Sequence, residues 1–288
     1  MTVVFALLSS VLWGLADFGG GLLTRRLPAL VVVVASQAAA ALALLVAVAV
    51  TGGFSTGSAH LLYAVGAGLV GPVAMICFYR ALALGPMGVV SPLATVGVIV
   101  PVAVGLLLGE RPGLFQAAGI AVAAVGVVLA GGPQLRGEPV QRTAVLLTLV
   151  AAFGFGAVMA LMAEATSGAS GLLLALLVQR ACNLVVGGGA LVRAARREPG
   201  TYRLSDLTGA GPRTLLTVAA VGLADVSANG AFVLASGFGS VAVAAVLASL
   251  YPVVTAVSAR LLLGERLRPV QAAGSGLALA GAILLAAH

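Results

Sequence analysis

Apolar residues occur along this chain in long runs, without the short alternating pattern of a half-buried strand. Each run is bounded by charge, glycine or proline, and each is about 20 residues long. A hydrocarbon core about 30 Å thick requires roughly that length of helix to cross it. The pattern therefore predicts ten membrane-spanning helices, at residues 3–22, 28–51, 60–82, 87–108, 113–131, 143–164, 170–192, 212–233, 239–262 and 268–287.

The composition agrees with this pattern. Of 288 residues, 61% are hydrophobic and only 8% are charged, and the mean hydropathy is +1.18. These values are typical of a membrane protein. The ten runs leave only short connections, so no separate soluble domain is expected. The predicted fold class is an all-α integral membrane protein, and the first run is a true span because no Lys or Arg precedes it.

Arginines are distributed unequally between the two sides that these spans define. The net charge of +7 alone would suit a protein that binds nucleic acid. The basic residues instead follow the positive-inside rule of membrane proteins, so no nucleic-acid partner is expected. The rule predicts a cytoplasmic (inner) membrane protein with odd-numbered connections in the cytoplasm and both termini outside. The odd-numbered side holds Arg25, Arg26, Arg80, Arg136, Arg142, Arg193, Arg196, Arg197, Arg203, Arg213, Arg260, Arg266 and Arg268, and the other side has Arg111 alone.

The hexamer LLLGER occurs twice, at residues 106–111 and 261–266, and marks an internal repeat. The repeat predicts two five-helix units, residues 1–137 and 138–288. Because five is odd, the second unit enters the membrane from the opposite face, and the two units are inverted repeats. Inverted repeats are the basis of alternating access in secondary transporters. Further matched pairs are Gly14 with Gly156, Gln37 with Gln179, Gly68 with Gly222, and Gly126 with Gly281.

The repeated hexamer has the chemistry of a corner between two helices. Gly109 and Gly264 can adopt the left-handed conformation that ends a helix. Glu110 and Glu265 directly precede the next helix, whose N-terminal dipole favours a carboxylate. We therefore expect the hexamer to be a structural corner and not a direct substrate contact.

Prolines interrupt the spans that lead into these corners. The fourth span contains Pro92 and Pro101, and the ninth contains Pro252. A proline frees a backbone carbonyl, which is tolerated at membrane depth where it borders protein or a wet cavity. We expect hinges or breaks in these two helices.

Several of these features carry a family resemblance. They are Trp13 and Gly14, residues 78–81, Pro252 and the two Gly-Glu-Arg corners. Over essentially its whole length the chain resembles the drug/metabolite transporter superfamily, in particular its ten-helix EamA-type members. The resemblance implies a carrier for small metabolites, often an exporter of amino acids or drugs, without an ATPase subunit.

Two features depart from the family pattern. Gly97 stands in the first repeat at the position of Pro252 in the second. Many relatives also look as if their termini are cytoplasmic, whereas the arginines here predict the reverse.

Three charged residues, Arg180, Asp225 and Asp17, lie inside spans and away from their ends, where an ionised group is costly and marks a functional candidate. Two interpretations are open for the pair. Arg180 and Asp225 form a structural ion pair, or Arg180 binds a substrate carboxylate and Asp225 a substrate amine or a coupling proton. The first repeat has Ala38 and Gly71 at the matching positions, so the chemistry lies in one repeat. Further candidates for substrate binding or coupling are Trp13, Gln179, Asn183, Asn229 and Tyr251.

Other functional classes find little support. The chain has no H-E-x-x-H, G-x-S-x-G or P-loop motif, which argues against an enzyme or an ATP-driven pump. A G-x-G-x-x-G pattern at residues 66–71 lies inside a span, so no cofactor is expected. A passive channel and a lipid flippase are the alternatives to a carrier. The expected partners are a small-molecule substrate, the lipid bilayer and, as a candidate coupling ion, a proton, with the protein a monomer or homodimer.

Overall fold

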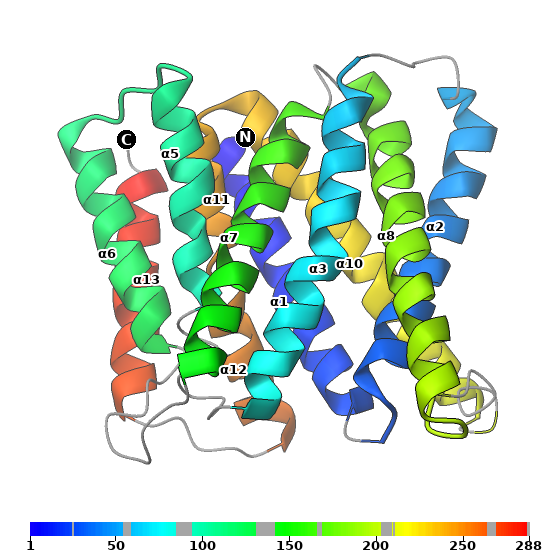
Figure 1. Ribbon diagram of the computed structural model, residues 1–288. Coiled ribbons are helices and arrows are strands. Elements are labelled where there is room, and N and C mark those ends of the chain that lie inside the picture. Colours follow the sequence, from blue (N-terminus) through cyan, green and yellow to red (C-terminus); the bar gives the residue numbers. More distant parts are fainter. Residues whose placement is uncertain are drawn as a thin grey trace.

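The computed structural model (Figure 1) describes the chain except residues 25, 54–58, 85–93, 131–141, 166–168, 203–208, 210, 264–268 and 287–288. The described residues form helices joined by short connections. The elements are α1 (Thr2–Thr24), α2 (Ala29–Thr51), α3 (Leu61–Leu84), the 3-10 helix η2 (Thr95–Val98), α5 (Ile99–Leu107), α6 (Leu114–Ala130), α7 (Arg142–Glu164), α8 (Ala169–Arg197), α10 (Pro212–Phe238), α11 (Val241–Ala248), α12 (Tyr251–Leu263) and α13 (Pro269–Ala286).

These elements make the ten predicted crossings within the described part of the chain (Figure 1). Helices α1, α2, α3, α7, α8 and α10 each contain an apolar stretch long enough to span a membrane. The fourth crossing combines η2 and α5, and the ninth combines α11 and α12. The prediction of an all-α fold with two inverted five-helix repeats is confirmed.

Both interrupted crossings belong to the spans that contain the predicted prolines. Pro252 is the second residue of α12, directly after the break between α11 and α12. Pro101 is the third residue of α5, just after the 3-10 turns of η2 pass into α-helix. Pro92 lies outside the described residues.

The two faces of the bundle differ in charge. The N-terminus and the end of α13 lie at the same end of the bundle (Figure 1), here named the terminal face. The opposite end, named the basic face, holds the odd-numbered connections. Its described arginines are Arg26, Arg80, Arg142, Arg193, Arg196, Arg197 and Arg213, whereas Arg111 lies on the terminal face.

Helix α8 is longer than the sequence pattern predicted. The predicted span ended at residue 192, but the helix continues to Arg197 and places three predicted loop arginines on its last turns. Cations near a helix C-terminus are stabilised by the exposed carbonyl groups there. Long arginine side chains can also reach water from a helix that still runs alongside apolar surface. The apolar run therefore marks the membrane-embedded part of α8 and not its end.

Each repeat packs its helices against the other repeat. Helix α1 packs on α10, and its repeat mate α7 packs on α3, the mate of α10. Helix α1 also packs closely on α12, and its mate α7 packs on α5. A Cβ on Gly14 of α1 would lie 2.8 Å from the carbonyl oxygen of Tyr251, and one on Gly156 of α7 would lie 2.8 Å from the Val100 Cβ. Small residues thus let the two halves interlock at matching positions.

Helices α6 and α13 show the inverted symmetry most directly, because they are repeat mates that pack on each other. A Cβ on Gly126 would lie 2.6 Å from the Ala278 Cα. In return, a Cβ on Gly281 would lie 2.7 Å from the Ala123 Cα. Gly126 matches Gly281, and Ala123 matches Ala278, at the same offset of 155 in sequence. The contact is therefore reciprocal, as a two-fold axis in the membrane plane requires.

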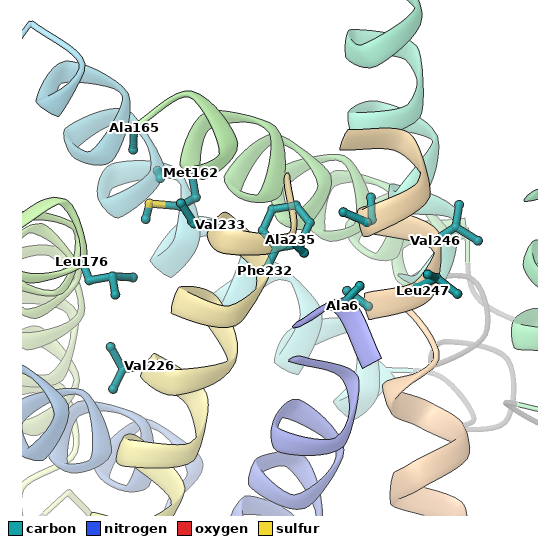
Figure 2. Packing of buried hydrophobic residues seen from close by; sticks show 14 of the residues in the cluster. Ala6, Met162, Ala165, Leu176, Val226, Phe232, Val233, Ala235, Val246 and Leu247 are labelled. Carbon is teal, nitrogen blue, oxygen red and sulfur yellow. The ribbon is translucent and has the colours of Figure 1, made fainter. Parts of the chain in front are cut away.

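The apolar core lies towards the terminal face and surrounds α11. All eight residues of α11 are buried. Phe232 of α10 and Leu247 of α11 belong to one cluster with Ala6 of α1, as Figure 2 shows. This packing closes the middle of the bundle at the terminal face.

The corner after α5 has the predicted conformation. Gly109 is left-handed, with φ at 95°. Its N–H donates to the carbonyl of Leu106 at 3.1 Å, and the N–H of Glu110 donates to that of Gly105 at 2.9 Å. This pair of bonds is a Schellman cap. The matching corner at Gly264 and Glu265 lies outside the described residues, as does the predicted boundary between residues 137 and 138.

Adding one methyl group at the α6–α13 contact tests the reciprocal packing. We expect Gly126→Ala and Gly281→Ala each to lower the free energy of unfolding by about 1–3 kcal/mol, because the new Cβ meets backbone atoms. The measurement is Tm of the purified protein in detergent. Gly276→Ala is the matched control on α13, since its Cβ would enter open space. Equal Tm values for all three variants would contradict the contact.

Candidate functional site

A cavity of about 300 Å³ lies between the two repeats. Its wall is built by α1, α2, α3, η2, α7, α8, α10 and α12. Asp17 on α1, Val33 on α2 and Gly187 on α8 lie in the halves of their helices nearest the basic face. The cavity therefore extends from the middle of the bundle towards the basic face, and the buried α11 lies on the side of the terminal face.

All eight residues predicted from the sequence to bind substrate or couple transport line this one cavity. They come from four helices that are far apart in the chain, which the interlocking of the repeats brings together. The residues are Trp13 and Asp17 on α1, Gln179, Arg180 and Asn183 on α8, Asp225 and Asn229 on α10, and Tyr251 on α12.

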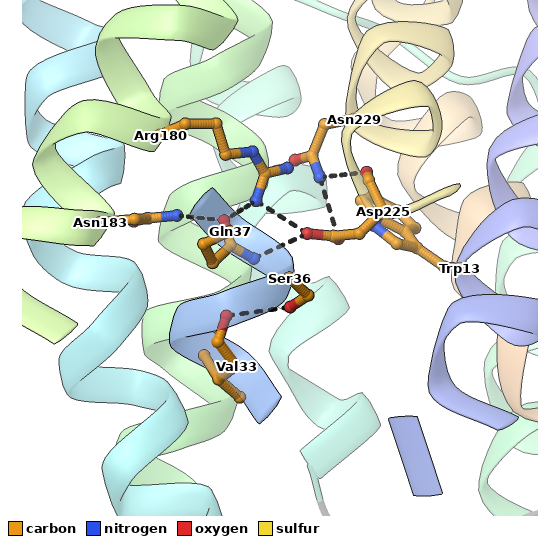
Figure 3. Close-up of polar contacts among 8 residues, drawn as sticks. All are labelled: Trp13, Val33, Ser36, Gln37, Arg180, Asn183, Asp225 and Asn229. Atoms are coloured by element: carbon orange, nitrogen blue, oxygen red, sulfur yellow. Dashed lines mark hydrogen bonds and ion pairs between the residues drawn. The ribbon is translucent and has the colours of Figure 1, made fainter. Parts of the chain in front are cut away.

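Asp225 is the centre of the polar contacts (Figure 3). Its Oδ2 accepts from the Arg180 Nη1 at 2.7 Å and from the Gln37 Nε2 at 3.1 Å. Its Oδ1 accepts from the Trp13 Nε1 at 3.1 Å and from the Asn229 Nδ2 at 3.3 Å. Four donors from α1, α2, α8 and α10 thus compensate one carboxylate, as a charge at membrane depth requires.

Arg180 is more deeply enclosed than its partner. Its side chain is 3% exposed, against 26% for Asp225. The same Nη1 also donates to the Gln37 Oε1 at 2.5 Å, and that oxygen accepts from the Asn183 Nδ2 at 3.3 Å. The two other guanidinium nitrogens, Nε and Nη2, are buried without a hydrogen-bond partner among the described residues. Arg180 therefore faces protein, and Asp225 faces the cavity.

Asp17 differs from both members of the pair. It lies one turn from Trp13 on the same helix and lines the cavity. Its side chain is exposed, and no hydrogen bond or ion pair reaches it from the described part of the chain. Trp13 packs edge-on against Tyr251, with ring centroids 6.3 Å apart. Two aromatic rings and a carboxyl group without a partner among the described residues therefore border the same space.

Glu110 binds a helix N-terminus, but not the one that the sequence predicted. The expected partner was the next helix, α6. Its carboxylate instead reaches across to α11 of the other repeat, accepting from the Val241 N–H at 2.6 Å and the Ser240 hydroxyl at 2.7 Å. Gly105 makes room for this carboxylate, because a Cβ there would lie 2.8 Å from the Glu110 Cδ. Glu110 of the first repeat thus binds α11 of the second repeat, the helix that closes the bundle at the terminal face.

Gln37 was missing from the predicted site. It bonds to both Arg180 and Asp225 and is 8% exposed. A signal was present, since Gln37 is the repeat mate of Gln179, the residue next to Arg180. The predicted amides lie close to Arg180 or Asp225 on the same helix, whereas α2 carries no charged residue that would point to Gln37.

The described residues offer no metal site, because no three His, Cys, Asp or Glu side chains come together among them. The buried charges of this site compensate one another without an ion. The contacts instead suit the binding of a small polar or charged molecule in a largely apolar cavity.

The sequence matches the EamA-like transporter family over residues 1–132 and 142–287. No curated protein matches the chain in sequence. Among solved structures 28 chains match. One, described as "Crystal structure of protein", has a TM-score of 0.76 and 16% identity, with 99% of this chain and 96% of that chain covered. At this identity the likeness concerns the fold alone. With both repeats matched, the chain belongs to the EamA-like transporter family of multi-pass membrane proteins, a family of small-molecule transporters.

Proposed function

We propose that this protein is a secondary transporter that exports small metabolites across the cytoplasmic membrane by alternating access. The observation that carries the proposal is the cavity between two inverted repeats, which extends towards one face and is covered at the other by α11. Two similar halves can exchange conformations and so expose a central site to each face in turn. A passive channel would instead need a pore continuous through both faces.

The charge of the two faces supports export as the direction of transport. The positive-inside rule makes the basic face cytoplasmic. The cavity extends towards that face, so this conformation would load substrate from the cytoplasm, as an exporter does. Small amino acids and drug-like organic molecules are of a size that a cavity of about 300 Å³ accommodates.

We assign Asp225 and its four donors to the floor of the binding site. The Arg180–Asp225 pair fixes α8 and α10 against each other, and the cavity-facing side of Asp225 remains available to substrate. Because Asp225 and Gln37 already occupy the Arg180 Nη1, a substrate carboxylate would have to bind Nε or Nη2, which are both buried. The pair therefore supports the shape of the site, and contact with substrate falls mainly to Asp225, Trp13 and Tyr251.

Transport in liposomes tests the proposed function. Flux of labelled amino acids and organic cations is measured with and without a pH gradient. A carrier should show saturable flux that is accelerated by unlabelled substrate on the far side. Unsaturable conductance would support a channel and contradict the proposal.

Removing the ion pair separates packing from substrate contact. Either single variant, Arg180→Gln or Asp225→Asn, leaves one buried charge unpaired and should cost about 3–5 kcal/mol of stability. The double variant removes both charges and should recover most of the lost Tm. We expect its transport rate to stay at least about tenfold below wild type, since tenfold corresponds to only about 1.4 kcal/mol of lost substrate contact. Recovery of both Tm and transport would assign the pair to packing alone.

Weakening the Glu110 contact should open the terminal face. Glu110→Gln replaces charge-assisted bonds worth about 1.5–3 kcal/mol with weaker ones. A cysteine at the buried Ala244 of α11, in a protein lacking Cys77 and Cys182, reports opening through its maleimide labelling rate. We expect labelling to become about tenfold faster, the change that about 1.4 kcal/mol produces in an equilibrium. Glu164→Gln, at the terminal end of α7, is the control and should leave the rate unchanged.

If Glu110→Gln labels at the wild-type rate, the carboxylate does not hold α11 in place. The contact would then be a feature of one conformation without influence on the opening of the terminal face.

A further inference from the structure

The charges that border the cavity are unequally accessible. Arg180 is the one basic side chain among the described lining residues, and its side chain is 3% exposed. Asp225 is 26% exposed, and Asp17 is more exposed still. A solute entering the cavity therefore meets two carboxylates, while the guanidinium lies behind Gln37 and Asp225.

The two carboxylates also differ in how far their charge is compensated. Asp225 accepts hydrogen bonds on both oxygens and forms an ion pair with Arg180. Asp17 has no hydrogen bond or ion pair within the described chain. Of the two aspartates in the described wall, Asp225 is paired with the one arginine, and Asp17 is the carboxyl group that has no basic partner there. A carboxylate within a membrane span is costly unless a partner or water compensates it.

The surroundings of Asp17 suit an organic cation. Trp13 lies one turn away on α1, and Tyr251 packs against Trp13. Aromatic faces attract ammonium groups, by about 2 kcal/mol or more when the contact is desolvated. Phe78 and Phe155, with ring centroids 5.8 Å apart, add apolar wall for the body of a ligand.

We propose that the cavity binds a small organic cation, with its ammonium group at Asp17 and its apolar part against Trp13 and Tyr251. This inference rests on the proposed function only in treating the cavity as the substrate site. It adds a substrate class, since Asp17 then selects for positive charge over neutral and anionic analogues.

The chain supplies its own probe for binding. Trp13 is the single tryptophan of the protein and lies in the wall of the cavity. Its fluorescence in the purified, detergent-solubilised protein can be titrated with four compounds that share a phenyl ring. These are 2-phenylethylamine, 2-phenylethanol, 3-phenylpropionate and phenylalanine, which present a cation, a neutral hydroxyl, an anion and a zwitterion.

We expect the amine to bind at least about tenfold tighter than the alcohol, and the anion to bind weakest. Asp17→Asn should remove the preference for the amine while changing the Kd of the alcohol less than about twofold. Asp17→Glu keeps the charge and should retain the preference. Glu164→Gln, distant from the cavity, should match wild type.

Three results would overturn the proposal. One is tightest binding of the anion or the zwitterion, which would place a substrate carboxylate at Arg180. Another is an unchanged amine-to-alcohol ratio in Asp17→Asn. The last is a Trp13 response to sodium chloride alone at the same affinity as to the amine, which would indicate an inorganic cation site. The wild-type series decides the charge preference even if Asp17→Asn fails to fold.

Liposome flux separates this inference from the proposed function. Charge-selective binding without flux would leave the cation site standing and reject transport. Saturable flux with no preference for the amine would leave transport standing and reject the cation site.

Discussion

Burial of opposite charges in an apolar bundle is the constraint on which this structure depends. Arg180 and Asp225 lie at membrane depth, where neither charge is tolerable alone. Their 2.7 Å contact, with Gln37 and Trp13 as further partners, ties together α1, α2, α8 and α10. Since α1 and α2 belong to one repeat and α8 and α10 to the other, the same bonds that satisfy the charges hold the halves in register. Asp225, the centre of this network, also lies in the wall of the cavity and forms its floor.

The two repeats are symmetric in backbone and asymmetric in chemistry. Matching glycines give reciprocal contacts between α6 and α13. At the site, by contrast, the first repeat has Ala38 and Gly71 where the second has Arg180 and Asp225. Gly71 lines the cavity opposite Asn183. Small residues in the first repeat thus make room for the cavity, and polar residues in the second repeat supply its hydrogen-bonding groups.

Much of this arrangement could be predicted from the sequence, because bilayer thickness fixes helix length and an odd number of helices per repeat fixes the inversion. Six of the eight site candidates were found because charged and amide groups are rare in apolar runs, and the other two, Trp13 and Tyr251, are aromatic. Two features required the structure. The partner of Glu110 lies in the other repeat, and no local rule points across the bundle to α11. Gln37 has no charged residue on its own helix, so its role appears only once Arg180 and Asp225 are seen to share it.

Alternating access requires the cavity to open to the two faces in turn. Distances between spin labels on α3 and its repeat mate α10 measure this directly, with one pair at Leu62 and Phe238 on the terminal face and another at Arg80 and Arg213 on the basic face. In bilayers, adding a transported solute should lengthen the distance at one face and shorten the distance at the other. The fraction of molecules that changes distance should be the same at both faces. Two distances that stay fixed, or that lengthen together, would contradict alternating access.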